Sequence, residues 1–233
     1  MIKQVVVLAG GLATRLYPIT KKVPKAMVPV AGKPFLEHQI AQFKEHGIEE
    51  VVMCVGHLSE QIVDYFGDGS EFGISMVYSK EDSKLDTGGA IKLALPYLAE
   101  SFFVIYGDSY LSQSYTPVVD FYEQHKEETG SRGLMTVYKN DNDIEPSRVL
   151  LDDIFVKKYQ KDPPPPNAHY MEYGLNIFER EIIDQVDGQV FPISDYFDLL
   201  SPKKQLLAFE VKERFYEIGS HDGLAETEVL LES

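Results

Sequence analysis

The sequence predicts an α/β protein of three layers, in which helices cover both faces of a mostly parallel, mixed central sheet. Patterns of buried strands alternate with patterns of amphipathic helices through about the first 140 residues, and the connections are short. The strand patterns are continuous apolar runs, as strands covered on both faces require. From about residue 140 the alternation stops, and short strands around a proline-rich loop predict a smaller β-rich portion.

The first part of the chain contains five strand patterns and four helix patterns. Strands are expected at 5–9, 49–56, 74–79, 102–106 and 133–138. Helices are expected at 35–47, 59–67 and 87–98, and after Thr116, with Pro117 at the first helical position. Gly47 and Gly67 are expected to end the first two helices, and Ser59 is expected to cap the second.

The second part adds a hairpin, a long strand and a final helix. SRVLLDD and IFVKKYQ predict the hairpin, with its turn at Asp152-Asp153. Further strands are expected at 170–178, 205–211 and 214–219, and helical segments near 179–186, 193–201 and 222–231. We therefore predict one domain over residues 1–233, with a first part to about residue 139 and a second part from about residue 140.

Charge is distributed unevenly along the chain. The first 36 residues contain six lysine and arginine residues and no acidic residue, although the whole chain has a net charge of −15. The overall charge argues against a nucleic-acid partner, whereas the basic island indicates a small anionic ligand. No apolar run is long enough for a membrane span. The single cysteine, Cys54, lies in a strand pattern, so a buried thiol and a reducing, cytoplasmic setting are expected.

A glycine pair, Gly10-Gly11, follows the first strand. Glycines at this place let backbone N–H groups approach phosphate oxygens closely. Arg15 and Lys25 follow, the first able to bind phosphate as a fork and the second as a point charge. The pattern is neither the dinucleotide fingerprint nor a P-loop, because G-x-G-x-x-G and G-K-[ST] are absent. The loop predicts a site for a nucleotide phosphate.

The stretch GGLATRLYPITKKVPKAMVPVAGKP, residues 10–34, resembles the signature of the sugar-1-phosphate nucleotidyltransferase family. That signature is G-G-x-G-T-R-L-x-P-x-T-x-x-x-P-K-x-x-x-P-x-x-G-x-P, and Ala13 stands where the family usually has Gly or Ser. The resemblance extends over most of the chain. It implies the three-layer, Rossmann-like nucleotidyltransferase fold, with nucleotide on residues 1–139 and sugar phosphate on residues 140–233.

A second stretch, LDTGGAI at 85–91, resembles the turn L-G-T-A/G-G-A-I that lies near the nucleotide base in this family. Asp86 replaces the usual Gly. Its carboxylate could contact the base or ribose, or it could cap the helix, and both interpretations are open. The nucleotide-binding residues implied by the resemblance are Leu8, Ala9, Gly10, Gly11, Thr14, Arg15, Lys25, Asp86, Thr87 and Gly88. Arg15 would stabilise the leaving pyrophosphate, and Lys25 would contact the α-phosphate or the sugar phosphate.

The resemblance also implies a bound Mg²⁺. IYGDSYL at 105–111 resembles the family's strand end with Gly-Asp, and a carboxylate there is a natural ligand beside phosphates. FYEIGSHDGL at 215–224 matches the family's later D-x-G-T or D-I-G segment and places Glu217 at the second metal carboxylate. We predict that Asp108 and Glu217 hold Mg²⁺, that Asp108 joins Arg15 and Lys25 as a catalytic residue, and that Asp222 caps the last helix.

The sugar phosphate is expected on the second part of the chain. YQKDP at 159–163 resembles the family's F-x-E-K-P, whose lysine holds the sugar phosphate, and Lys161 matches it. YMEYGLNIF resembles the family's N-A-G-I-Y-x-F strand and places Glu172, a pure acceptor when ionised, at the sugar hydroxyls. The implied set is Gly107, Lys161, Glu172, Tyr173 and Gly174.

The resemblance implies transfer of a nucleotidyl group from a nucleoside triphosphate to a sugar 1-phosphate, by a stand-alone enzyme. The chain is most similar in kind to short relatives that activate mannose-type or heptose 1-phosphates, and to those that activate muramic sugars. Guanylyl transfer is the first prediction. Cytidylyl or uridylyl transfer to phosphocholine, a phosphonate or an amino sugar phosphate is an alternative, with Tyr170, Glu172 and Tyr173 around an ammonium group.

A second alternative is a non-catalytic homologue that senses nucleotide sugars. Such a protein would be expected to lose Arg15, Lys25 or Asp108, and all three are present. No nucleic acid or membrane partner is expected. Monomer and homodimer both remain open.

Overall fold

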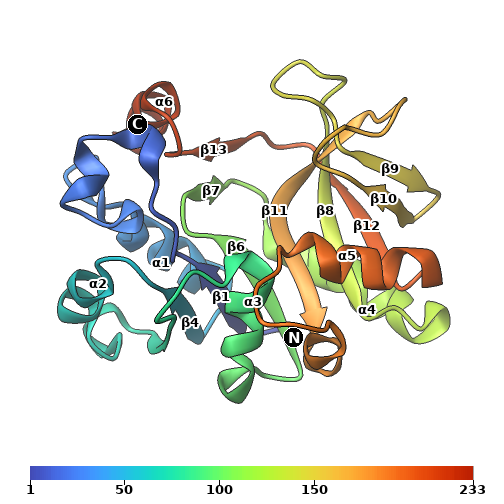
Figure 1. Cartoon of the computed structure of the whole chain (residues 1–233), viewed down its shortest axis with the longest axis horizontal. Coiled ribbons are helices and arrows are strands. Elements are labelled where there is room, and N and C mark those ends of the chain that lie inside the picture. The colour runs from blue at the N-terminus through green and yellow to red at the C-terminus, as the bar shows by residue number, and fades with distance from the viewer. Residues whose placement is uncertain (233) are drawn as a thin grey trace.

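A nine-stranded sheet forms the centre of the computed structural model, which describes residues 1–232 (Figure 1). The strands follow one another across the sheet in the order β5-β4-β1-β6-β11-β8-β12-β10-β9. The strands of this sheet are β1 (Gln4–Leu8), β4 (Glu50–Val55), β5 (Ser75–Lys80), β6 (Ser101–Tyr106), β8 (Gly133–Lys139), β9 (Val149–Asp152), β10 (Phe155–Tyr159), β11 (Tyr170–Glu179) and β12 (Leu206–Val211). The predicted mixed sheet is confirmed: β5, β4, β1 and β6 are parallel, and β11 is antiparallel to β6 and β8.

Six α-helices accompany the sheet in residues 1–232. They are α1 (Phe35–Glu45), α2 (Ser59–Phe66), α3 (Asp86–Leu93), α4 (Tyr115–Thr129), α5 (Ser194–Leu200) and α6 (His221–Glu232). Two short sheets lie outside the main one, formed by β2 (Pro29–Val30) with β3 (Lys33–Pro34) and by β7 (Ser109–Leu111) with β13 (Phe215–Glu217). The sequence analysis missed β2, β3 and β7, because strands of two or three residues have no detectable period.

Two local predictions are wrong. Ser59 is the first residue of α2 and makes no capping bond, because Leu58 precedes the helix in the left-handed region at φ 57°. Pro117 is the third residue of α4. The helical segment expected near 179–186 is confirmed, as the 3₁₀ helix Arg180–Gln185.

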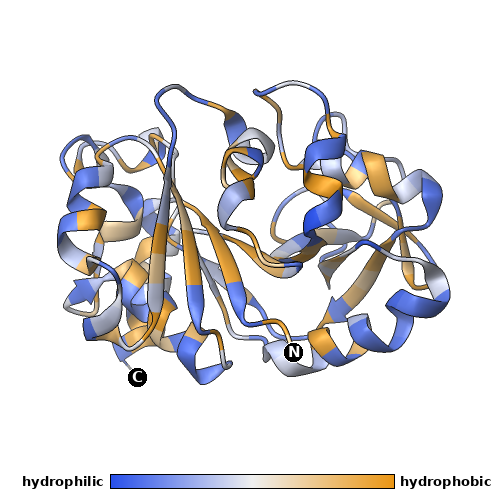
Figure 2. Ribbon diagram, turned by 90° about the horizontal axis from the view of Figure 1, so that it is seen from below, coloured by the Kyte–Doolittle hydropathy of each residue, from blue (hydrophilic) through white to orange (hydrophobic). Residues whose placement is uncertain are grey.

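Two apolar cores lie on opposite faces of the sheet, because successive strand residues point to opposite sides. Val5 and Val7 pack into the core shared with α1, α2 and α4, whereas Val6 packs into the core shared with α3 and α5. Figure 2 shows the apolar strands between the helical layers. Cys54 is buried in the second of these cores, as predicted, and burial raises the pKa of its thiol to about 12.

The two parts of the chain share the central sheet. β8 belongs to the first part, yet it lies between β11 and β12 of the second part. The division of ligand roles near residue 139 therefore does not coincide with a boundary in the sheet, and it stays a prediction.

A third apolar cluster joins the two ends of the chain. It consists of Leu16, Val28, Val30, Phe35 and Ile218, with Leu224 and Leu231 of α6 packed against it. Figure 1 shows α6 beside the segment that follows β1. This cluster fixes the loop that carries Arg15 and Lys25 against the strand that carries Glu217.

The start of α3 packs closely on the segment at 189–193. A Cβ atom at Gly88 would lie 2.4 Å from the Phe191 ring, and one at Gly89 would lie 2.1 Å from the carbonyl oxygen of Gln189. The amide groups of both glycines donate to the carbonyl oxygen of Phe191, at 2.9 and 3.1 Å. The glycine pair therefore allows backbone to approach backbone at this point.

We expect Gly89→Ala to lower the free energy of unfolding by about 2–3 kcal/mol, because the added methyl group overlaps a carbonyl that cannot move alone. Gly11→Ala is the control, since a Cβ atom there has no neighbour within 4 Å. Denaturant unfolding measures both. Equal stability of the two variants would contradict the close packing of α3.

Candidate active site

A cavity of about 780 Å³ opens at the carboxyl ends of β1, β4, β5 and β6. Ligands of open α/β sheets bind outside the carboxyl ends of strands, so this is the expected position of a site. The predicted residues that line it are Leu8, Ala9, Gly10, Gly11, Thr14, Lys25, Asp86, Thr87, Gly107 and Asp108. The predicted residues that do not line it are Arg15, Gly88, Lys161, Glu172, Tyr173, Gly174 and Glu217.

Gly10 and Gly56 enclose a carboxylate that the sequence analysis missed. A Cβ atom on Gly10 would lie 2.6 Å from Oε1 of Glu81, and one on Gly56 would lie 2.7 Å from the same oxygen. The other oxygen, Oε2, accepts a hydrogen bond from the backbone N–H of Leu85 at 3.0 Å. Within residues 1–232, Oε1 has no hydrogen-bond partner. The sequence did offer one indication of Glu81: it directly follows β5, and side chains that follow the parallel strands lie at the edge of the sheet where the cavity opens.

Two departures from the family pattern, Ala13 and Asp86, occupy the left-handed region, with φ of 48° and 60°. A residue with a Cβ atom costs about 1–2 kcal/mol there, which explains why the family usually has Gly or another small residue. The Asp86 side chain accepts a hydrogen bond from the Thr87 amide at 2.8 Å. Of the two interpretations of Asp86, this bond supports a local backbone role at the start of α3.

The start of α3 is held from the second part of the chain. Thr87 Oγ1 accepts a hydrogen bond from the Ile193 amide at 2.8 Å. Gly88 donates its amide to Phe191 and does not line the cavity, so the structure assigns it a packing position. A role of Gly88 in nucleotide binding stays a prediction.

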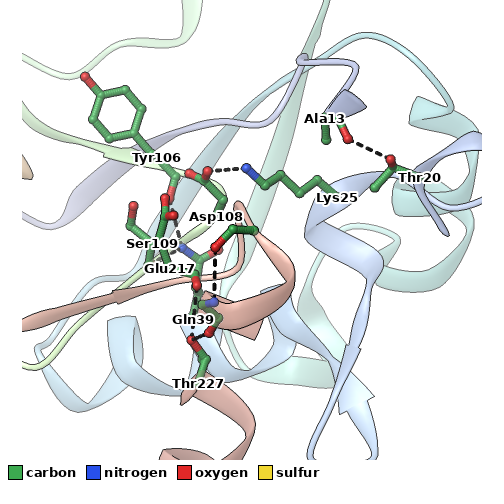
Figure 3. Close-up of polar contacts among 11 residues, drawn as sticks. Ala13, Thr20, Lys25, Gln39, Tyr106, Asp108, Ser109, Glu217 and Thr227 are labelled. Carbon is green, nitrogen blue, oxygen red and sulfur yellow. Dashed lines mark hydrogen bonds and ion pairs between the residues drawn. The ribbon is translucent and has the colours of Figure 1, made fainter. Parts of the chain in front are cut away.

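Lys25 and Asp108 form an ion pair at the edge of the cavity (Figure 3). Their side chains are only 18% and 23% exposed. Asp108 is the second residue after β6, and its carbonyl oxygen accepts a hydrogen bond from the Ile218 amide at 2.9 Å. Because Glu217 pairs with Ser109 across the β7–β13 ladder, the two predicted metal carboxylates come from neighbouring backbone positions.

Glu217 completes a cluster of two carboxylates and two cations. Burial, together with the charge of Asp108, raises the pKa of Glu217, and Arg15 and Lys25 oppose that rise. Arg15 also lies close to Gly219, since its Nη2 is 3.0 Å from where a Cβ atom would stand. The structure therefore brings the predicted catalytic residues and both predicted metal ligands together, although Arg15 and Glu217 lie outside the cavity wall.

The donor set of this cluster fits Mg²⁺. Mg²⁺ binds proteins through one or two carboxylates and takes its other ligands from phosphates and water. Within residues 1–232, no group of three or more His, Cys, Asp or Glu side chains converges as a complete metal site. Asp108 and Glu217 would thus hold the ion only in part, which suits an ion that arrives with a nucleotide.

The sugar-site residues are divided by the alternation of β11. Glu172 accepts hydrogen bonds from Tyr106 Oη at 3.0 Å and from Asn176 Nδ2 at 2.7 Å. Burial raises the pKa of Glu172, and these two bonds oppose the rise. Its carboxylate reaches the cavity only through Tyr106, which lines it. Gly174, at φ 102°, leaves room for the Tyr106 ring, 3.4 Å from its absent Cβ.

Two of the predicted sugar-site residues, Tyr173 and Lys161, do not line the cavity. The Tyr173 side chain is 2% exposed in the core, and its ring meets Phe215 edge-on. Lys161 is exposed on the loop after β10. The Tyr173 side chain points away from that of Glu172, because successive residues of a strand point to opposite faces of the sheet. The motif that suggested both residues does not record this alternation. Sugar-phosphate binding by Lys161 stays a prediction.

Fold and site together define a Rossmann-like α/β protein whose cavity at the carboxyl edge of the sheet is bordered by glycine-rich backbone and by the Lys25–Asp108 pair. The family model described as "Nucleotidyl transferase" matches residues 4–232. The chain belongs to this family.

Several similar proteins are guanylyltransferases. A mannose-1-phosphate guanyltransferase of Kluyveromyces lactis is 30% identical over 239 residues, which cover 97% of this chain and 64% of that protein. A D-glycero-α-D-manno-heptose 1-phosphate guanylyltransferase of Campylobacter jejuni is 44% identical over 108 residues, 46% of this chain and 48% of that protein. The chain thus spans less than two thirds of these relatives.

Among solved structures, HddC from Yersinia pseudotuberculosis has a TM-score of 0.81 at 26% identity. The match covers 99% of this chain and all of that one. A second structure of HddC is complexed with GMP-PN and gives a TM-score of 0.80. No helix within residues 1–232 combines the length and hydropathy that a membrane span requires.

We expect Glu217→Gln to raise the melting temperature of the metal-free protein at neutral pH. The folded-state pKa of Glu217 is raised, so its contribution to stability is present below the unfolded pKa and is lost as the pH rises. The gain in melting temperature should therefore be larger at about pH 8 than at about pH 4, below the ordinary pKa of Glu. A gain that is the same at both pH values would contradict a raised pKa of Glu217 in the folded protein.

Proposed function

We propose that the chain transfers a nucleotidyl group from a nucleoside triphosphate to a sugar 1-phosphate and releases pyrophosphate. The cluster of Arg15, Lys25, Asp108 and Glu217 beside the Gly10-Gly11 loop carries this proposal. Both reactants are polyanions, and two cations beside backbone amides lower their mutual repulsion. The names of the similar proteins support the reaction class.

The proposed chemistry is an in-line displacement at the α-phosphorus. An oxygen of the sugar phosphate forms the new bond, and the bond from the α-phosphorus to the bridging oxygen of the pyrophosphate breaks. Arg15 stabilises the charge that develops on pyrophosphate, and Lys25 contacts the α-phosphate or the sugar phosphate. The residues act by positioning and by electrostatic stabilisation, with no covalent enzyme intermediate. Mg²⁺, when held by Asp108 and Glu217, supplies Lewis-acid neutralisation of phosphate charge.

Guanine is the proposed base. Guanine has two adjacent donors, N1–H and N2–H₂, and a carboxylate can accept both. The unpartnered Oε1 of Glu81 borders the cavity between Gly10 and Gly56. Uracil and thymine offer one donor between two carbonyl oxygens that repel a carboxylate, and adenine and cytosine offer an acceptor beside their amino group.

A mannose- or heptose-type 1-phosphate is the proposed acceptor, supported by the names of the similar proteins. Burial of the Tyr173 ring disfavours the phosphocholine alternative, because the ring presents no face to the cavity. The Lys25–Asp108 pair disfavours the non-catalytic alternative, since both members are present and adjacent. We propose a cytoplasmic setting, where nucleoside triphosphates and reduced thiols such as Cys54 occur.

We expect pyrophosphate release to require Mg²⁺, GTP and a mannose- or heptose-type 1-phosphate together. The measurement is pyrophosphate release with GTP, UTP, CTP, ATP and dTTP, each against a panel of sugar 1-phosphates and phosphocholine. Release with another pair would support nucleotidyl transfer but show that the proposed base or sugar is wrong. Absence of release with every pair would overturn the proposed activity.

We expect Arg15→Ala and Lys25→Ala each to lower kcat by about 10²–10³-fold, the loss found when one donor to a developing anion is removed. Lys22→Ala is the matched control, because Lys22 is an exposed lysine of the same basic loop. It should retain turnover. Unchanged turnover in the Arg15 and Lys25 variants would contradict the roles assigned to them.

We expect Glu81→Gln to reduce the preference for GTP over UTP by about 10–100-fold in kcat/KM, the value of one bidentate base contact. The amide oxygen of the introduced glutamine side chain can still accept the Leu85 amide, so the loop is retained. Asp82→Asn is the control, since Asp82 lines the same cavity and is exposed. An unchanged ratio in Glu81→Gln would show that guanine is selected elsewhere.

A further inference from the structure

Helix α1 carries two buried glutamines, Gln39 and Gln42, which are 0% and 6% exposed. Neither side chain reaches the cavity. Each amide nitrogen donates to backbone carbonyl groups on the segment that follows β6. Burial of an amide is unfavourable unless its polar atoms are paired, and among the described residues the side-chain oxygen Oε1 of each glutamine has no hydrogen-bond partner. The glutamines therefore indicate a requirement for these particular bonds.

Gln39 bridges the turn that holds Asp108. Its Nε2 donates to the carbonyl oxygen of Tyr106 at 3.1 Å and to that of Ser109 at 2.8 Å. These carbonyl groups flank Gly107 and Asp108 on both sides, as Figure 3 shows. Gln42 makes a single bond, to the Leu111 carbonyl at 2.6 Å, three residues beyond Asp108. Only Gln39 therefore closes the turn itself.

The other side of the same turn is fixed by the C-terminal segment. The Ile218 amide donates to the Asp108 carbonyl. Thr227 Oγ1 donates to the Gly223 carbonyl at 2.7 Å and also lies 3.3 Å from the Glu217 carbonyl. Thr227 is fully buried. Among residues 1–232, Gln39 has the only side-chain amide that donates to both ends of this turn. Loss of its bonds frees the carbonyl groups on either side of the proposed metal ligand.

We infer that Gln39 is a positioning residue for the metal pair, which holds the Asp108 carboxylate beside Glu217 through the backbone of the 106–109 turn. This inference rests on the proposed function, because it assumes that Asp108 and Glu217 bind a divalent cation. Residues that orient metal ligands typically change metal affinity by about 10–100-fold when they are replaced. Gln39 does not line the cavity and would act only through the backbone of the turn.

The test measures Mn²⁺ binding by electron paramagnetic resonance, in the presence of α,β-methylene-GTP, whose α–β bridge cannot be cleaved. Gln39→Met retains the length of the side chain and removes both bonds. We expect it to weaken Mn²⁺ binding by about 10–100-fold. We expect the half-saturating Mg²⁺ concentration for turnover to rise by a similar factor, with kcat at saturating Mg²⁺ little changed.

Gln42→Met is the matched control, because it removes the same kind of buried bond from the same helix. It should lower the melting temperature to a similar degree and leave Mn²⁺ affinity within about twofold of the wild type, as an independent site would. Equal affinity in Gln39→Met and wild type would overturn the inference, as would an equal loss of affinity in both variants. If Gln39→Met does not fold, Gln39→Leu replaces it, because leucine is also uncharged and lacks both donors, and the same outcomes apply.

A further variant separates this inference from the proposed function. Asp108→Asn should abolish the Mn²⁺ binding that depends on the nucleotide analogue. If wild type and Asp108→Asn bind Mn²⁺ alike, the metal site itself is wrong and the role of Gln39 falls with it. If they differ, the metal site stands, and the Gln39 variants alone decide the inference.

Discussion

The site depends on the pairing of two short strands, β7 and β13, which brings two carboxylates together against their mutual repulsion. Asp108 and Glu217 are 109 positions apart in the sequence, and the ladder places them at neighbouring backbone positions. Arg15 and Lys25 offset that repulsion, and Lys25 pairs with Asp108 directly. Like charges in a partly buried place destabilise the fold unless cations or a metal ion compensate them. The basic island therefore has a structural role as well as the proposed catalytic one.

The apolar cluster around Leu16, Phe35 and Ile218 stabilises the pairing of β7 with β13. It packs the loop after β1 onto α6, so both cations and the later carboxylate rest on one small core. Buried polar side chains of the same two helices, α1 and α6, add to it, with Gln39 bonded to the 106–109 turn and Thr227 near the Glu217 carbonyl. Hydrogen bonds to the backbone on either side of a metal-ligating residue fix its position and leave its carboxylate oxygens free for the metal ion.

Close backbone contacts, rather than special side chains, shape the nucleotide side of the cavity. Gly10 and Gly56 leave room for the Glu81 carboxylate, and Gly88 and Gly89 admit the 189–193 segment. The second part of the chain therefore supports the first part at α3, as it does at Asp108. In this chain, a Cβ atom at any of these glycines would overlap a carboxylate, an aromatic ring or a carbonyl group.

The sequence alone determined the order and type of the larger elements, since continuous apolar runs and helical periodicity are local properties. It also determined the glycine loop with Arg15, Lys25 and Asp108, because that motif is contiguous or lies at a strand end. Only the tertiary structure decided that Tyr173 faces the core, that Gly88 packs on Phe191, and that Glu172 reaches the cavity through Tyr106. The same holds for Glu81 and Gln39, whose partners are distant in the chain. Side-chain direction on a strand and contacts between distant segments depend on packing, which no local pattern of residues records.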